Sequence, residues 1–135
     1  MSNSGWALQQ SIYATLTTDA AVLALLGGPR IYDDVPQGAA FPYLTIGQST
    51  LRDWSTGSEE GHEHTLTLHV WSREKGRKQT HAIIAALREA LHDRALTLDG
   101  HRLINLRHEL SEARREPDGD TYHGIVRYRA VTEPA

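Results

Sequence analysis

Residues 29–47 read Pro29-Arg30-Ile31-Tyr32-Asp33-Asp34-Val35-Pro36-Gln37-Gly38-Ala39-Ala40-Phe41-Pro42-Tyr43-Leu44-Thr45-Ile46-Gly47. The pattern of apolar residues changes across this stretch: they recur at helical spacing before it and alternate as in strands after it. Pro36 and Pro42 each remove an amide donor and hold the preceding residue in an extended conformation. The stretch therefore predicts a structured loop followed by a strand from about Tyr43 to Ser49.

Two helical segments are predicted before this stretch. The first runs from about Trp6 to Leu16, and Thr17-Thr18-Asp19 then offers N-cap side chains to a second, shorter helix. Gly27-Gly28-Pro29 ends the second helix, because glycine accepts the left-handed conformation of a helix end and proline cannot continue a helix. One apolar stripe is expected on the first helix, made by Trp6, Leu8, Ile12, Tyr13 and Leu16.

Strands and one long helix are predicted after the stretch. The polar segment from Thr50 to Gly61 is typical of a long hairpin loop, and His62 to Trp71 alternates as a strand. A helix follows from about Arg77 to His92, then a short strand and a hairpin of two long strands. In the first of these long strands, one face is expected to carry Arg102, Ile104, Leu106, His108 and Leu110.

This order of elements predicts a single α+β domain over residues 1–135. We expect a mostly antiparallel sheet of about four main strands. We expect the N-terminal helices and the one long helix to pack on one face of this sheet.

The charge of the chain is small and unevenly distributed. Fourteen basic and 17 acidic side chains give a formal net charge of −3, which argues against broad nucleic-acid binding by phosphate neutralisation. Residues 1–70 carry two basic and seven acidic side chains, a net −5, whereas residues 71–135 carry twelve basic and ten acidic ones, a net +2. An acidic half and a basic half can pair within one subunit or between subunits.

Neither a membrane segment nor a thiol-based site is expected. The chain has no cysteine, which excludes disulfides, thiolate metal sites and cysteine nucleophiles. Its start lacks the basic-then-apolar layout of a signal peptide, and no run approaches the roughly 20 apolar residues of a membrane span. We expect a soluble protein that is made in the cytoplasm and has no membrane partner.

The sequence shows no recognisable catalytic, cofactor or metal site. His62 and His64 lie two residues apart and would point to one side of a strand, and two imidazoles with a carboxylate can bind zinc. Further ligands at recognisable spacing are missing, so we interpret this cluster as a solvated junction between loop and strand. No Gly-x-Ser-x-Gly motif and no glycine-rich phosphate loop occurs. We therefore predict a protein that is not an enzyme and needs no cofactor or metal.

Arginines concentrate in the predicted C-terminal hairpin. A basic face for nucleic acid is one interpretation of them. Acidic residues alternate with them and would neutralise much of such a face, so we favour salt bridges between strands or between subunits. The arginines are Arg107, Arg114, Arg115, Arg127 and Arg129, and the acidic residues are Glu109, Glu112, Glu116, Asp118 and Asp120.

Several segments together resemble the tail completion, or tail terminator, family of long-tailed phages and phage-derived gene transfer agents. The motifs Tyr32-Asp33-Asp34-Val35-Pro36 and Phe41-Pro42-Tyr43, at this spacing, are the most specific of them. The resemblance spans nearly the whole chain. The other matching segments are Ala7-Leu8-Gln9-Gln10-Ser11-Ile12-Tyr13 with Thr18-Asp19, His69-Val70-Trp71-Ser72 with Gly76, Leu91-His92, Leu96-Thr97-Leu98-Asp99-Gly100-His101, and Asp118-Gly119 with His123-Gly124 and Arg127-Tyr128-Arg129.

The resemblance implies a structural role in particle assembly. It implies a ring of six copies that caps the tail tube, joins the tail to the head-side connector and lets DNA pass through its centre. The implied partners are further copies of the chain, the major tail tube protein and the connector or stopper protein, and the implied location is the tail or neck of the phage or gene transfer agent particle. Two alternatives remain: another head–tail junction or minor tail component, and a small ligand-binding or enzymatic α+β domain.

Candidate assembly residues lie in two places, the predicted long loop and the end of the predicted hairpin. Loops often carry function, and exposed tryptophans favour interfaces. The alternatives are that these residues form solvated loop tips and that the Trp54 ring folds back over the sheet edge. The candidates are Arg52, Asp53, Trp54, Glu59 and Glu60 on the loop, with Arg114 and Arg115 at the hairpin end.

Overall fold

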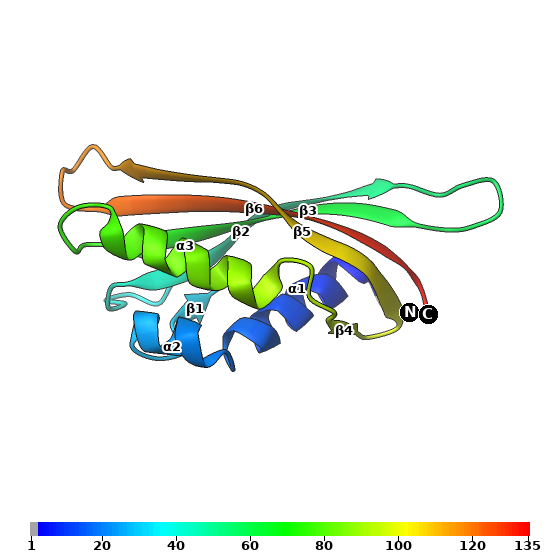
Figure 1. Ribbon diagram of the computed structural model, residues 1–135, viewed down its shortest axis with the longest axis horizontal. Coiled ribbons are helices and arrows are strands. Elements are labelled where there is room, and N and C mark those ends of the chain that lie inside the picture. Colours follow the sequence, from blue (N-terminus) through cyan, green and yellow to red (C-terminus); the bar gives the residue numbers. More distant parts are fainter. Residues whose placement is uncertain (1–2) are drawn as a thin grey trace.

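The computed structural model describes residues 3–135 and contains one sheet, shown in Figure 1. Its strands are β1 (Ile31–Tyr32), β2 (Tyr43–Asp53), β3 (His62–Ser72), β4 (Thr97–Leu98), β5 (His101–Arg115) and β6 (Tyr122–Pro134). The strand order is β1-β2-β3-β6-β5-β4, with β1 parallel to β2 and the other pairs antiparallel. The sheet thus has six strands instead of the expected four, because β1 and β4 have two residues each, too few to show an alternating pattern.

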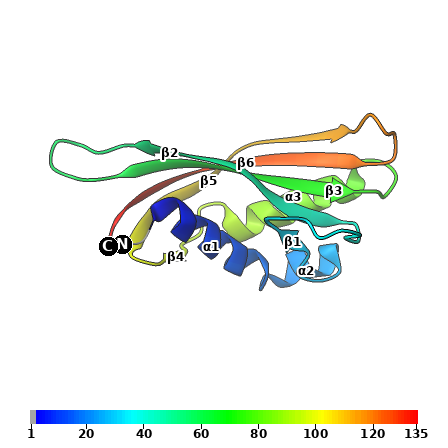
Figure 2. The same cartoon turned by 180° about the vertical axis from the view of Figure 1, so that it is seen from behind.

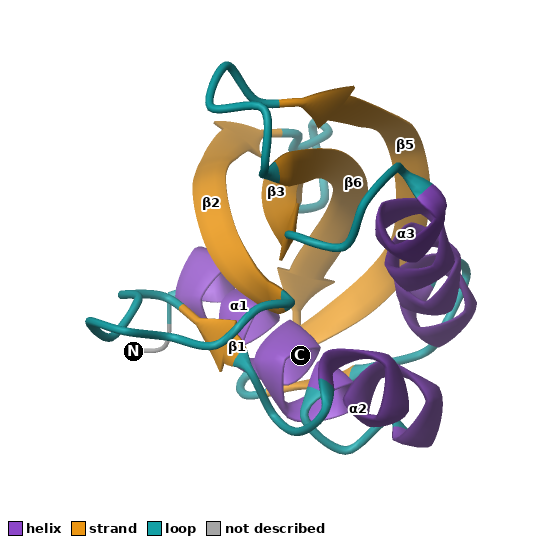
Figure 3. Cartoon of the chain, turned by 90° about the vertical axis from the view of Figure 1, so that its left-hand side faces the viewer, coloured by secondary structure: helices purple, strands orange, loops and turns teal. Residues whose placement is uncertain are grey.

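Three helices lie on one side of this sheet, which curls around them (Figures 1 and 3). They are α1 (Ser4–Leu16), α2 (Ala20–Leu26) and α3 (Lys78–Leu91). Asn3 caps α1 and Asp19 caps α2, because each side chain accepts a hydrogen bond from a backbone N–H of the first turn. Gly27, with a φ of 79°, ends α2 as the sequence predicts. No helix within residues 3–135 is long and apolar enough to cross a membrane.

The hydrophobic core lies between the helices and the sheet. From His64 to Ser72 every second side chain of β3 is buried, in agreement with the predicted alternation, and α3 buries one apolar stripe that includes Ile83, Leu87 and Leu91. Gly124 allows α3 to approach β6 closely, because a Cβ at this position would lie 2.9 Å from Thr80 Cγ2. The largest fully buried side chains are Tyr128, Leu8, Ile12, Leu16, Leu26, Leu44, Leu68, Ile83, Leu87, Leu91, Leu106 and Val22.

The apolar stripe predicted for α1 is wrong at two positions. Leu8, Ile12 and Leu16 are buried, but Trp6 and Tyr13 are 55% and 43% exposed. At 100° per residue, positions seven apart lie within about 20° of each other, and position 6 lies almost opposite position 8. Trp6 and Tyr13 therefore form a second, solvent-facing side of the helix.

β2 is longer than predicted. It extends to Asp53, so the loop expected from Thr50 to Gly61 is reduced to residues 54–61. Every residue from 48 to 60 is exposed. A strand that is exposed on both faces needs no alternation of apolar and polar residues, and its sequence therefore looks like a loop.

β5 departs from its expected face. Irregularities in its pairing with β6, between Leu103 and Asn105 and between His108 and Leu110, shift the register twice. Each such irregularity moves the following side chains relative to the period of two. Leu106 is buried, but Ile104 and Leu110 are 50% and 38% exposed instead of sharing its face.

Candidate assembly surfaces

Two hairpin ends extend from opposite ends of the sheet (Figures 1 and 2). Residues 48–65, the distal part of the β2–β3 hairpin, are called the arm, and residues 109–127, the distal part of the β5–β6 hairpin, are called the β5–β6 end. The predicted candidates divide between these two ends, so one chain does not bring them together. Arg52, Asp53, Trp54, Glu59 and Glu60 lie on the arm, and Arg114 and Arg115 lie on the β5–β6 end.

The arm is exposed from residue 48 to residue 60, whereas its β3 strand pairs with β6 from His62 onward and buries His64. Arg52 and Asp53 belong to β2 and not to a loop, whereas Trp54, Glu59 and Glu60 lie in the loop. Asp53 accepts hydrogen bonds from the backbone N–H and the Oγ of Ser55, at 3.2 and 2.6 Å. These bonds hold the pKa of the Asp53 carboxyl below its usual value, so the arm keeps this negative charge at neutral pH.

Trp54 lies partly against the sheet. The guanidinium of Arg129 on β6 lies 5.3 Å from the centroid of the indole ring, and Arg129 also pairs with Glu63 at 2.6 Å. The Trp54 side chain is nevertheless 53% exposed. One part of this residue thus packs on its own chain, and the rest is accessible to a neighbouring molecule.

Hydrogen bonds hold the turn of the β5–β6 end in one conformation. Asp118 accepts bonds from the backbone N–H groups of Asp120 and Thr121 and from Thr121 Oγ1, and the Thr121 bonds lower the pKa of Asp118. Arg115 Nε donates to the carbonyl oxygen of Gly119 at 3.1 Å. Arg114 Nε lies 3.3 Å from Glu116 Oε1. Contacts within the same hairpin end therefore hold the side chains of both candidate arginines, Arg114 and Arg115.

A chain of hydrogen-bonded side chains, which the sequence did not suggest, joins this turn to the sheet. Glu116 Oε1 lies 2.8 Å from His123 Nδ1, and His123 Nε2 lies 2.7 Å from His69 Nδ1. The ring of Trp71 stacks on His123, with centroids 3.9 Å apart. Burial lowers the pKa of His69, and the hydrogen bond from His123 lowers the pKa of Glu116. The contacts of His123 with His69 and Trp71 join residues more than 50 positions apart in the sequence, so no local pattern indicates them.

The His62 and His64 pair makes structural hydrogen bonds. His62 Nδ1 lies 2.8 Å from Ser4 Oγ, and His64 Nε2 lies 2.8 Å from Thr132 Oγ1. Burial, together with the neighbouring His62 and His101, lowers the pKa of His64 to about 4. Across residues 3–135 no three histidine, aspartate or glutamate side chains are grouped as metal ligands would be. The pair connects α1 and β6 to β3.

The arginines of the C-terminal hairpin form ion pairs within the chain. Arg127 pairs with Glu109 at 2.6 Å, across β5 and β6, and Arg107 pairs with Asp93 at 3.4 Å. The Arg127–Glu109 and Arg129–Glu63 pairs join neighbouring strands, as expected, whereas Arg107 and Arg114 pair with Asp93 and Glu116, which lie outside the strands. Neighbouring carboxylates thus interrupt the positive charge of this hairpin.

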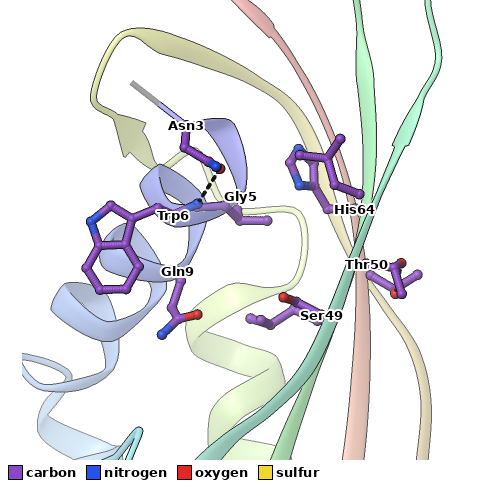
Figure 4. Close-up of a pocket in the computed structure, with 11 residues that line it drawn as sticks. Asn3, Gly5, Trp6, Gln9, Ser49, Thr50 and His64 are labelled. Carbon is purple, nitrogen blue, oxygen red and sulfur yellow. Dashed lines mark hydrogen bonds between the residues drawn. The ribbon is translucent and has the colours of Figure 1, made fainter. Parts of the chain in front are cut away.

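Two hollows beside Trp6 form a surface that the sequence analysis missed. One lies between the start of α1 and the arm and is lined by Asn3, Gly5, Trp6 and Gln9 together with residues of β2 and β3 (Figure 4). The other shares Trp6 with the first and is also lined by Tyr13, Tyr32, Asp33 and Asp34. The seven-residue spacing of Trp6 and Tyr13 could have indicated this surface, because it places both side chains on one side of the helix.

Comparison with known proteins identifies the family. Residues 10–133 match the family described as Tail completion protein gp17. The Tail completion protein gp17 of Bacillus phage SPP1 is 29% identical over 89 residues, which are 66% of each protein. A chain in the structure of the virion of a native gene transfer agent particle has a TM-score of 0.89 and 30% identity, over 98% of this chain and 99% of that one. The structure of SPP1 gp17 has a TM-score of 0.61 and 22% identity, over 96% and 95%, and shows a shared fold. The chain therefore belongs to the tail completion protein gp17 family, and it is a structural protein of the tail or neck of a phage-type particle.

Proposed function

We propose that this protein caps the end of the tail tube as a closed ring of six copies and joins the tail to the head-side connector while DNA passes through the centre. Its partners are further copies of itself, the major tail tube protein and the connector. The observation that carries the proposal is the match to the family over residues 10–133.

Two features of the molecule support a ring. The arm and the β5–β6 end project from opposite ends of the sheet, so contact between them in two copies uses different surfaces on each copy. Such heterologous contacts close into a ring when the rotation between copies permits it. The net charge of −3 suits a central channel that must not hold DNA phosphates.

The ionisable clusters support a structural and non-enzymatic role. His62, His64, His69 and His123 each hydrogen-bond to another side chain of the same chain. These bonds connect α1, the strands and the β5–β6 turn to each other. The groups that would be candidates for acid–base chemistry thus hold the fold together.

Deleting the gene tests the proposal. Particles assembled without the protein are expected to have tails of irregular length and heads without tails, visible by negative-stain electron microscopy. Supplying the wild-type gene from a plasmid should restore both features. Tails of normal length attached to heads, in the absence of the protein, would contradict the proposal.

Trp54→Ala tests the arm as a contact surface. The variant is expected to fold, because the ring is 53% exposed, but to reduce the number of heads joined to tails. Ser58→Ala, in the same loop, is the matched control and should assemble normally. Unchanged assembly of the Trp54 variant would remove this residue from the contact surface.

A further inference from the structure

We propose that the free edge of β2 in one copy, residues 49–53, pairs as an antiparallel strand with the free edge of β5 in the next copy, residues 111–115. The pairing places Leu51 opposite Ala113 and Arg52 opposite Glu112. This inference rests on the proposed ring and specifies the contact that would build it. The partner surface is a second copy of the same chain.

Both strands have an unpaired edge at the required place. β1 pairs with β2 at Leu44 and Thr45, and β4 pairs with β5 at His101 and Arg102. Beyond these points, the described part of the chain pairs no strand with the outer edge of residues 49–53 or 111–115. An open edge presents unpaired N–H and C=O groups, which are a template for another strand. Neither segment contains the proline or lysine that often protects an edge.

The faces of the two strands match in this register. Leu51 lies opposite His64, and Ala113 lies opposite Gly124, so both point to the helix side of the sheet. Arg52 lies opposite Glu63, and Glu112 lies opposite Ile125, so both point to the other side. A continuous sheet requires that directly opposed residues point to the same side. Leu51, 46% exposed in the single chain, would then lie beside the small side chain of Ala113.

Charge selects this register over its neighbours. Arg52 and Glu112 are exposed, and neither has an ion-pair partner within residues 3–135. A shift of two residues in one direction places Arg52 opposite Arg114, and a shift in the other direction places Asp53 opposite Glu109. Opposite charges stabilise a cross-strand pair, whereas like charges destabilise it.

A second pair of charges fits the same register. Pairing Leu51 with Ala113 puts Arg115 opposite Ser49, at the start of the free edge of β2. The chain leaves β1 at this end of the edge, where the exposed carboxylates of Asp33 and Asp34 line a hollow together with Ile46. The neighbour's Arg115 would therefore approach two carboxylates.

The two segments cannot pair within one chain. Across the sheet, Leu51 is aligned with His64 on β3, Ala130 on β6 and Leu106 on β5. Leu51 is therefore three strand spacings from β5, and Ala113 lies seven residues further along β5 than Leu106. With strand spacings of about 4.8 Å and a rise of about 3.3 Å per residue, the separation is on the order of 25 Å. Any link between positions 51 and 113 must therefore join two copies.

Cysteine cross-linking tests the pairing, and the chain offers a clean background because it has no cysteine. Opposed Cα atoms of antiparallel strands lie about 4.5–5.5 Å apart, within the range of a disulfide. In purified tails, the Leu51→Cys/Ala113→Cys variant is expected to give a ladder of covalent oligomers on a non-reducing gel. Thr50→Cys/Ala113→Cys, whose side chains point to opposite faces, is the control and should give about tenfold less. Leu51→Cys/Ser111→Cys reports a slip of two residues.

Charge reversal gives a second, independent measurement. Arg52→Glu and Glu112→Arg, each alone, are expected to reduce the number of tailed particles about tenfold, because each places like charges opposite one another. The double variant should restore assembly. Tails that contain the cysteine variant but show no ladder, or the strongest ladder through Ser111, would overturn this pairing and leave the ring standing. Normal tails without the protein would instead overturn the ring itself.

Discussion

The arm and the β5–β6 end are both distal parts of long hairpins, yet they are stabilised differently. In the arm every residue from 48 to 60 is exposed, and Trp54 reaches back to Arg129. In the β5–β6 end, His123 is buried between Glu116 and His69 and stacks on Trp71. Local stability follows buried contacts and satisfied polar groups. The turn of the β5–β6 end is therefore fixed to the sheet through His123, whereas residues 48–60 of the arm are left accessible.

This difference explains how one fold can supply two unlike contact surfaces. A heterologous contact joins two different surfaces, one on each copy. The β5–β6 end is held by the hydrogen bonds of its turn and by the contact between His69 and His123. The outer edge of β2 at Leu51, by contrast, is open.

The largest expected contrast comes from the same substitution at two leucines. Leu68 is fully buried beneath the helices, and Leu51 on the arm is 46% exposed. Leu68→Ala is expected to lower the free energy of unfolding by about 2–5 kcal/mol, because it removes buried methyl groups and leaves a cavity. Leu51→Ala should change it by less than about 0.5 kcal/mol. Urea titration followed by circular dichroism measures both, and equal losses would contradict the contrast.

A second contrast uses two glycines. A Cβ at Gly47, on β2, would lie 2.5 Å from His69 Nε2, whereas a Cβ at Gly57, in the arm loop, would meet nothing within 4 Å. Gly47→Ala is expected to cost about 1–3 kcal/mol, because the ring of His69 must move out of its hydrogen bond with His123. Gly57→Ala should be neutral within about 0.5 kcal/mol.

The clash at Gly47 can be verified with a double variant. If it involves His69, Gly47→Ala should cost much less in a His69→Ala background. The free energies of the two single variants and the double variant, measured by urea titration, give the coupling. Simple additivity would show that the methyl group of the alanine acts elsewhere.

Acid is expected to lower the free energy of unfolding through His64, which joins the arm to β6. Its pKa in the folded protein is lowered to about 4, because the ring is buried beside Thr132. The unfolded chain binds a proton near pH 6.5, so it binds more protons than the folded chain between about pH 6.5 and 4. The free energy of unfolding therefore falls as pH falls through this window, by about 2 kcal/mol at pH 5.

His64→Gln isolates this contribution, because glutamine does not titrate. His69 and His108, which are partly buried, also have lowered pKa values and act in the same direction, so the variant should keep part of the pH dependence. The difference between wild type and variant, followed by urea titration from pH 8 to pH 5, is the measured quantity. Parallel curves would rule out His64 as the titrating group.

The sequence predicted the elements whose burial follows a regular period. Alternation identified β3, and cap residues and glycine placed α2 correctly, because each signal is local. The distal part of β2 was missed because it is exposed on both sides, and two shifts in register broke the period of β5. Trp6 and Tyr13 were wrongly assigned to the buried stripe of α1, because the prediction considered that they are apolar but not where they lie around the helix axis.

The candidate surfaces were predicted less completely than the fold. Composition and exposure suffice to suggest residues such as Trp54 and Arg115. The juxtaposition of Glu116, His123 and His69 depends on strand order, and the free edges of β2 and β5 depend on how short β1 and β4 are. Both require the three-dimensional pairing.

The smallest expected effect concerns the aromatic contact of the arm. Trp54→Ala removes the contact with the Arg129 guanidinium, 5.3 Å from the ring centroid, and should lower the free energy of unfolding by at most about 1 kcal/mol at this exposed site. Trp54→Phe keeps an aromatic face and should recover most of this loss. Arg129 remains paired with Glu63 in both variants, which limits the damage. A loss in the Trp54→Ala variant as large as that of Leu68→Ala would mean that the arm is part of the folded body, and it would remove the basis for treating the arm as a surface kept free for a neighbouring copy.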